Sequence, residues 1–115
     1  MSPRSRSRER ARFEAQAEVF AALGDQTRLL LVVKLAAGKP QSIAQLTAGS
    51  RLTRQAITKH LRVLERAGMV RCARSGRERR FAFNPRPMEE LREYLEGVSA
   101  QWDEALGRLQ AFVEA

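Results

Sequence analysis

The chain has 115 residues, with 21 basic and 13 acidic side chains, one His, one Cys and a formal net charge of +8. A chain of this length forms one domain and buries roughly 65% of its unfolded surface, so it needs no disulfide or metal cross-link. The single Cys72 excludes an intrachain disulfide, which suits a reducing cytoplasm. No apolar run reaches the roughly 20 residues that cross a bilayer. We therefore expect a cytoplasmic protein with no membrane partner and no required cofactor.

The positive charge is concentrated in two stretches. Residues 1–12 hold five basic and one acidic side chain, and residues 51–80 hold ten basic and two acidic, whereas residues 81–115 hold three basic and seven acidic. A basic block within a folded segment is typical of a surface that binds a polyanion, most commonly nucleic acid. A solvated basic surface is the alternative.

Residues 1–12 predict a flexible basic tail ahead of a domain that spans residues 13–115. The tail lacks the apolar stretch of a secretory signal, although abundant Arg and Ser with little acid are also typical of organelle transit peptides. It is either disordered and solvated, or an arm that follows phosphates or the minor groove of DNA. The arginines concerned are Arg4, Arg6, Arg8, Arg10 and Arg12.

Two helices are predicted in residues 13–37. Phe13, Ala17 and Phe20 follow helical spacing, which Gly24 ends. Asp25 is a suitable N-cap for a second helix over 26–37, whose segment 29–33 is apolar on nearly every face and predicts a central buried helix. A buried strand is the weaker alternative, because polar residues and alanines extend the segment to helical length.

A helix-turn-helix is predicted in residues 42–67. Ser42 can cap a short helix over 43–48, Gly49 suits a tight turn, and Thr53 caps the next helix. In that helix Ile57, Leu61 and Leu64 lie within about 60° of one another. The opposite face is polar and cationic, with Gln55, Thr58, Lys59, Arg62 and Arg66. This arrangement presents its second helix to a major groove.

A basic β-hairpin is predicted directly after that helix. Gly68 ends the helix, and residues 69–74 and 79–83 alternate in the manner of strands around the turn 75–78. The hairpin carries Arg74, Arg77, Arg79 and Arg80. It therefore resembles the wing of a winged helix-turn-helix.

A long terminal helix is predicted from Pro87 onward. Its apolar residues are spaced three and four apart, which is a heptad pattern: Met88, Leu91, Leu95, Val98, Trp102, Ala105, Leu109 and Phe112. Such a helix is roughly 37 Å long, more than the rest of the domain can cover. We expect part of the stripe to pack against a second copy, whereas packing entirely within its own domain is the alternative.

Two stretches resemble the ArsR family of bacterial winged-helix repressors. Residues 22–30 read ALGDQTRLL and residues 52–70 read LTRQAITKHLRVLERAGMV. The resemblance covers residues 13–115 and implies a homodimer that binds an operator with two recognition helices and two wings. It also implies repression of its own or a neighbouring operon.

The chain departs from the metal-sensing members of that family. Such members use Cys pairs near the recognition helix, or Asp and His on the terminal helix, whereas here Cys72 lies in a predicted strand and the terminal segment has no His. The segment Gln101–Asp103, followed by Leu106 and Leu109, resembles the non-metal branch. We therefore predict no metal site, and because the non-metal branch shares no common small-molecule effector, the resemblance implies none in particular.

His60, Cys72 and Trp102 each suit a structural role, and two of them also have an alternative functional role. His60 resembles the family's packing His. Cys72 fits a strand interior, with a redox sensor as the alternative because two arginines flank it. Trp102 fits an interface core, with an effector pocket as the alternative. The one His and the one Cys do not form a recognisable pair of nucleophile and base, so we do not expect an enzyme.

The sequence as a whole predicts a mainly α fold with a small β-hairpin, a winged helix-turn-helix that dimerises through its terminal helices and binds double-stranded DNA. Gln55, Thr58 and Lys59 are predicted to contact base edges, and Thr53, Arg54, Arg62 and the wing arginines are predicted to contact phosphates. The predicted dimer residues are Phe13, Leu91, Leu95, Val98, Trp102, Ala105, Leu109 and Phe112. A protein-binding winged helix and an RNA binder are the alternatives.

Overall fold

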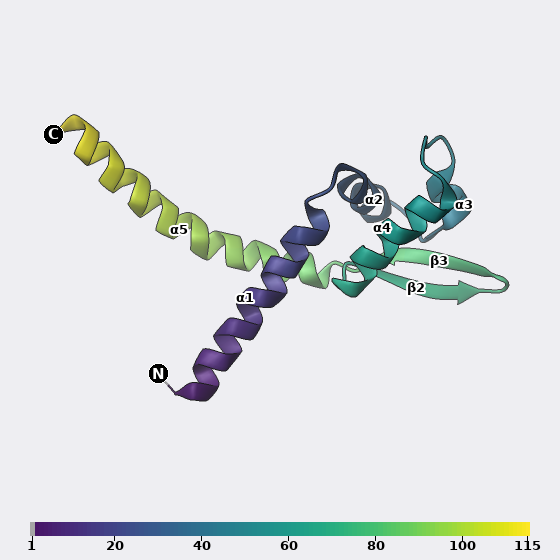
Figure 1. The fold of residues 1–115 in the computed structure, drawn as a ribbon, viewed down its shortest axis with the longest axis horizontal. Coiled ribbons are helices and arrows are strands. Elements are labelled where there is room, and N and C mark those ends of the chain that lie inside the picture. The colour runs from purple at the N-terminus through teal and green to yellow at the C-terminus, as the bar shows by residue number, and fades with distance from the viewer. Residues whose placement is uncertain (1) are drawn as a thin grey trace.

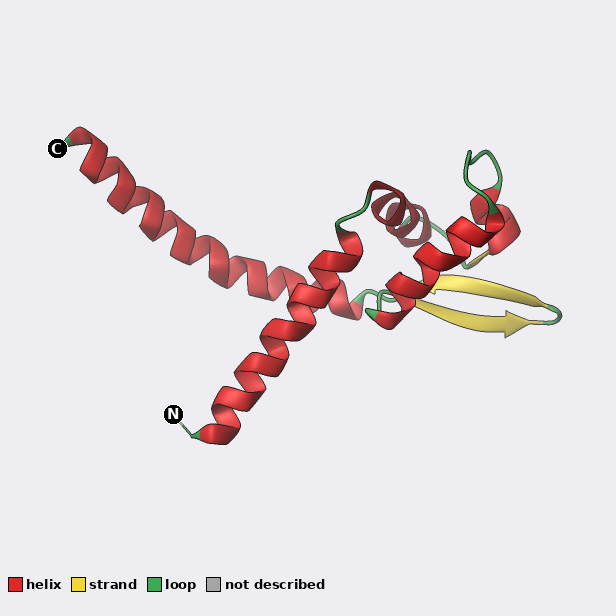
Figure 2. Ribbon diagram, viewed as in Figure 1, coloured by secondary structure: helices red, strands yellow, loops and turns green. Residues whose placement is uncertain are grey.

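The computed structural model describes residues 2–115 as five helices and one three-stranded antiparallel sheet (Figure 1). The helices are α1 (Pro3–Leu23), α2 (Gln26–Ala36), α3 (Ile43–Thr47), α4 (Arg54–Arg66) and α5 (Arg86–Glu114). The strands are β1 (Gln41–Ser42), β2 (Val70–Ser75) and β3 (Glu78–Phe83). Figure 2 shows how helix dominates the molecule. The predicted order of helices and hairpin is confirmed, and β1 is an addition to it.

Helix α1 begins ten residues earlier than Phe13, the predicted start. Ser2 is its N-cap, with Oγ accepting a hydrogen bond from the backbone N–H of Ser5 at 3.2 Å, and Pro3 occupies the first helical position. Both are favourable helix-start signals, since Pro has no N–H to leave unpaired. Residues 3–12 are therefore helical, although all are exposed, so the domain boundary at residue 12 stays a prediction. Met1 of the predicted tail lies outside the described residues.

The buried face of α1 does not include its phenylalanines. Gln16, Val19 and Ala22 face the core, whereas Phe13 and Phe20 are exposed. Phe13 and Phe20 thus lie on a surface that a single chain leaves uncovered.

The next three helices begin at the predicted caps. Asp25 Oδ2 accepts from the N–H of Arg28 at 3.0 Å, and Thr53 Oγ1 accepts from that of Ala56 at 3.1 Å. Ser42 forms a full capping box with Gln45, because each side chain pairs with the other residue's backbone N–H. These local bonds satisfy donors at the start of each helix that have no partner within it.

Helix α2 is not buried all round, contrary to the prediction. Leu31, Val32 and Leu35 lie in the core, but Leu29, Leu30 and Val33 are each about half exposed. The domain covers only one face of α2, with α1, α4 and β3 as its neighbours. The run of five apolar residues therefore has an inner and an outer side.

The sheet has the strand order β1-β3-β2, and all its pairs are antiparallel. The hairpin of β2 and β3 turns at Gly76 and Arg77, where Gly76 has φ +65°. That left-handed conformation suits glycine. Strand β1 pairs with the base of β3, with Gln41 opposite Phe81. The outer part of the hairpin extends away from the body as a wing (Figure 1).

The core lies between the helices, the base of the sheet and the start of α5. Its most deeply buried side chains come from α4 and the segment that follows it: Leu61, Leu64, Met69 and Val70. Gly68, with φ +77°, turns the chain out of α4, and the N–H of Met69 donates to the carbonyl of Leu64 at 2.9 Å. This closing bond is typical of a helix that ends in a left-handed glycine. It sets the direction in which the wing leaves α4.

Helix α5 leaves the body after its first turns (Figure 1). It has 29 residues, about 43 Å at 1.5 Å per residue, and Leu91 is its buried residue. Every residue from 99 to 115 is exposed. The alternative in which the terminal helix packs entirely on its own domain is therefore not what the structure shows.

Candidate nucleic-acid interface

The outer face of α4 forms an open groove of about 460 Å³. Five of the six DNA contacts predicted on this helix line the groove: Arg54, Gln55, Thr58, Lys59 and Arg62. The sixth, Thr53, caps the helix. Ile43 of α3 completes the lining. The groove and the buried row Ile57, Leu61 and Leu64 occupy opposite sides of α4, because apolar and polar residues alternate at helical spacing. The core thus holds α4 so that its polar face is free.

The cations of this groove are available to a ligand. Arg54, Lys59 and Arg62 take part in none of the ion pairs among residues 2–115. Thr58 is partly engaged, since its hydroxyl donates to the carbonyl of Arg54 at 2.7 Å. Its oxygen keeps an acceptor function and its methyl group can contact a thymine methyl. Gln55 is exposed, and the oxygen and the NH2 of its side-chain amide are free to pair with a base edge.

The wing concentrates positive charge beside this groove. Arg74 and Arg79 are direct cross-strand partners, and both are exposed. Like charges in this position destabilise a hairpin, so the pair is costly unless an anion lies against it. Arg77 occupies the turn, while Arg80 lies 3.5 Å from the carboxylate of Glu78 and is partly neutralised. Arg74, Arg77 and Arg79 are therefore the better placed cations of the four predicted.

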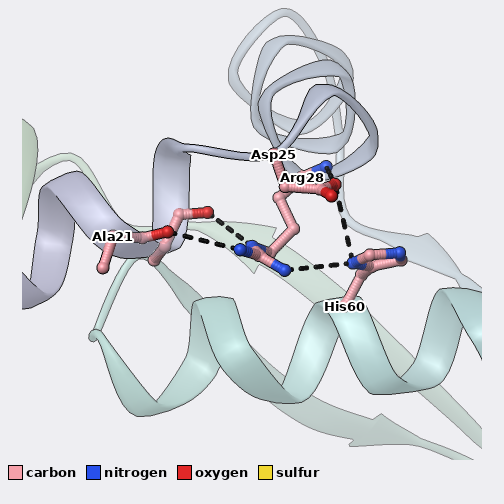
Figure 3. Close-up of polar contacts among 5 residues, drawn as sticks. Ala21, Asp25, Arg28 and His60 are labelled. Atoms are coloured by element: carbon pink, nitrogen blue, oxygen red, sulfur yellow. Dashed lines mark hydrogen bonds and ion pairs between the residues drawn. The ribbon is translucent and has the colours of Figure 1, made fainter.

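A polar cluster of Asp25, Arg28 and His60 connects α4 to the start of α2 (Figure 3). His60 was expected to pack, but its Nδ1 lies 3.7 Å from Asp25 Oδ2 and 3.4 Å from Arg28 Nη1. The hydrogen bond from the backbone N–H of Arg28 lowers the pKa of Asp25. Partial desolvation opposes this effect, and the charge of His60 when its ring is protonated, and that of Arg28, add to it. Sequence reasoning missed the cluster because Arg28 and His60 are far apart in the chain.

The lowered pKa of Asp25 predicts a loss of stability in acid. The unfolded chain binds its proton at a higher pH than the native one, so the carboxylate stabilises the fold above the unfolded pKa and ceases to do so as the pH falls through the native pKa. Urea unfolding of the wild type and of Asp25→Asn from about pH 6 to about pH 2 tests this, because Asn keeps the cap without the charge. The variant should lose less stability in acid. Parallel curves would refute the prediction, and Asp103→Asn serves as the exposed control.

The residues predicted for a dimer surface lie on α5 and α1. Leu95, Trp102, Leu109 and Phe112 are exposed, Trp102 at 65% and Phe112 at 80%, and so are Ala105 and Phe13. Val98 is half-buried. Leu91 differs, because it is 4% exposed and packs in the chain's own core. The exposed stripe thus begins after Leu91, and it also takes in Leu106 and Val113.

No other kind of site stands out among residues 2–115. No group of three or more His, Cys, Asp or Glu side chains in this part of the chain could hold a metal ion. Cys72 is half-buried opposite Phe81 in the sheet, against the core. None of the helices described is long and apolar enough to span a membrane.

A helix-turn-helix with a basic recognition helix and a basic wing defines a winged helix-turn-helix DNA-binding protein. Comparison with known proteins agrees. Residues 25–71 match the model of the arsR family of bacterial regulatory proteins. An uncharacterized HTH-type transcriptional regulator, YuzN of Bacillus subtilis, is 40% identical over 79 residues, which are 64% of this chain and 86% of that protein.

Solved structures show the same similarity. An ArsR-like transcriptional regulator from Rhodococcus sp. RHA1 has a TM-score of 0.74 and 33% identity, and the match covers 87% of this chain and 93% of that one. The homodimeric winged helix-turn-helix DNA-binding domain of Mb0332 from Mycobacterium bovis shares the fold, with a TM-score of 0.65, 21% identity, and coverage of 94% and 93%. The chain belongs to the ArsR family and is a DNA-binding transcriptional regulator.

Membership in this family makes the absence of metal ligands testable. We expect zinc, cadmium or arsenite at stoichiometric levels to leave the protein on its DNA, because thiolate and imidazole clusters are missing from residues 2–115. Fluorescence anisotropy of a labelled duplex with each metal measures this. Release that persists in Cys72→Ser and His60→Ala would reveal a site elsewhere.

Proposed function

We propose that this regulator binds an inverted-repeat operator in double-stranded DNA as a homodimer and represses its own or a neighbouring operon in the cytoplasm. The observation that carries the proposal is the α4 groove, whose unpaired cations and amide face away from the core. An α-helix of this kind fits the major groove, where Gln pairs with adenine and Lys with guanine acceptors. Gln55, Lys59 and Thr58 are the proposed base contacts.

The proposed phosphate contacts surround this helix. Arg54 and Arg62 line the same groove as Gln55 and Lys59, Thr53 lies at the helix start, and the wing lies beside α4. Phosphate contacts fix the position of a protein on DNA without reading its sequence. The wing contributions are Arg74, Arg77, Arg79 and, more weakly because of its ion pair, Arg80.

The homodimer is supported by the exposed stripe of α5. Soluble monomers rarely leave a contiguous stripe of this size uncovered, and a second α5 with the same heptad pattern can cover it. A two-fold dimer contacts DNA at sites one helical turn apart, roughly 34 Å, so that each subunit reads half of an inverted repeat. The proposed interface comprises Phe13, Leu95, Val98, Trp102, Ala105, Leu109 and Phe112, without Leu91.

Footprinting on the DNA upstream of the protein's own gene tests the proposal. We expect one protected inverted repeat that a cold specific duplex competes away. Parallel gel shifts with single-stranded RNA test the alternative of RNA binding, and pull-downs with protein extract test the alternative of protein binding. Binding to RNA or to a protein without any duplex footprint would refute the proposal.

Arg77→Ala in the wing should weaken binding to every duplex alike. A phosphate contact releases counterions, so the loss of one lowers the slope of log K against log salt by about one unit. Titrations between about 50 and 200 mM salt measure the slope. Arg108→Ala, an exposed arginine on α5, is the matched control. An unchanged slope in Arg77→Ala would remove this residue from the phosphate contacts.

A further inference from the structure

A single guanidinium joins three helices at the back of the recognition helix (Figure 3). Arg28 Nε donates to the carbonyl of Ala22 at 2.6 Å, and Nη2 donates to that of Ala21 at 3.3 Å. Its third nitrogen, Nη1, lies 3.4 Å from His60 Nδ1, which accepts when the ring proton is on Nε2. The end of α1, the start of α2 and the middle of α4 therefore meet at one side chain.

Arginine is the residue type that this junction requires. The last carbonyls of a helix have no full set of partners within it, and Arg28 supplies donors to those of Ala21 and Ala22, the first of which also accepts from the backbone N–H of Gly24. A guanidinium holds its donors in a rigid plane and can serve several acceptors at once, whereas a lysine ammonium is a point charge on a flexible chain. Three other charged side chains lie near this junction. The carboxylate of Asp25 lies 3.7 Å from His60, and Glu18 and Arg66 line a cavity of about 290 Å³ together with Arg28.

The contact between Arg28 and His60 restricts the orientation of α4. His60 directly follows Lys59, and the two side chains project on different sides of the helix, so a rotation of α4 about its axis moves both. Apolar packing at Leu61 and Leu64 is non-directional, while a hydrogen bond prefers a narrow range of angles. Base recognition requires side chains placed within about 0.5 Å. The bond from Arg28 thus constrains the rotation on which Lys59 and Gln55 depend.

We propose that Arg28 is a positioning residue for sequence recognition, which fixes the rotation of α4 through His60 and ties it to the end of α1. Helix α1 carries Phe13 of the proposed dimer surface, so the same side chain links that surface to the recognition helix. This inference rests on the proposed function, because it concerns the reading of an operator. It assigns Arg28 no contact with DNA.

The test compares four full-length variants on the footprinted operator and on a random duplex. Arg28→Lys and His60→Leu should each weaken operator binding about tenfold, the scale of one hydrogen bond to a charged group, and weaken random binding less than about twofold. His60→Gln should recover most of the loss, since its amide oxygen can accept from Arg28. Glu18→Gln, in the same cavity on α1 but outside these contacts, should leave both affinities unchanged.

Thermal unfolding and sedimentation accompany each titration, so that binding is compared among folded dimers. The two His60 variants provide the test if Arg28→Lys does not fold. Equal losses on operator and random DNA, unchanged operator affinity in Arg28→Lys and His60→Leu, or a His60→Gln variant as weak as His60→Leu would each overturn the inference. A wild type that fails to distinguish operator from random DNA would instead refute the proposed function, and the inference with it.

Discussion

Trp102→Glu should convert the dimer into monomers and abolish operator binding at concentrations where the wild type binds. Trp102 is 65% exposed in the single chain and lies in the middle of the apolar stripe of α5. In the proposed dimer the new carboxylate would be buried without a partner, at several kcal/mol per dimer when both copies are counted. Sedimentation velocity at micromolar concentration measures the shift, and operator titration measures its consequence.

The control for this variant places the same charge on the other side of the helix. Ala100 is exposed and lies opposite the stripe, so Ala100→Glu should stay dimeric and bind DNA normally. If Trp102→Glu remains a dimer with normal operator binding, α5 is not the dimer helix. The same conclusion would follow if the wild type were a monomer bound to a single half-site.

Lys59→Ala and Gln55→Ala should each weaken operator binding by about 1 to 3 kcal/mol and relax the choice of base at one position, because each removes a base contact. Both residues line the groove on α4, and neither packs in the core, so stability should change little. Competition titrations with operators altered at single positions measure the change in specificity.

Lys39→Ala is the matched control, since Lys39 is an exposed lysine in the segment between α2 and β1. Its operator affinity should equal that of the wild type. Losses in Lys59→Ala that are equal on operator and random duplex would show that Lys59 contacts phosphate and does not read a base.

The helices and the hairpin between residues 25 and 83 could be predicted closely, because their signals are local. A cap such as Asp25, Ser42 or Thr53 acts over three residues, and the bonds observed at each are those expected. Ser2 and Pro3 carry the same kind of signal at the start of α1, where the abundant arginines led to the prediction of a flexible tail. That difference shows that a local capping signal can outweigh the charge pattern around it.

The features that were not predicted depend on contacts between distant residues. Strand β1 is two residues long and forms because Gln41 pairs with Phe81 of β3. A segment this short has no periodicity from which a strand could be predicted. Likewise Leu30 and Val33 belong to an apolar run, and only the packing of α2 against one side of the domain shows that they face outward.

The sequence by itself determined the order of the helices and the hairpin, the polar face of α4, the charge of the wing and the heptad stripe of α5, since each follows from spacing along one segment. The tertiary structure decided which apolar residues the domain covers: it buries Leu91 and leaves Trp102 free. It also brought Arg28 of α2 to His60 of α4. Such contacts arise only when separate helices pack. Burial and long-range hydrogen bonds depend on residues distant in the chain, which a local sequence pattern does not identify.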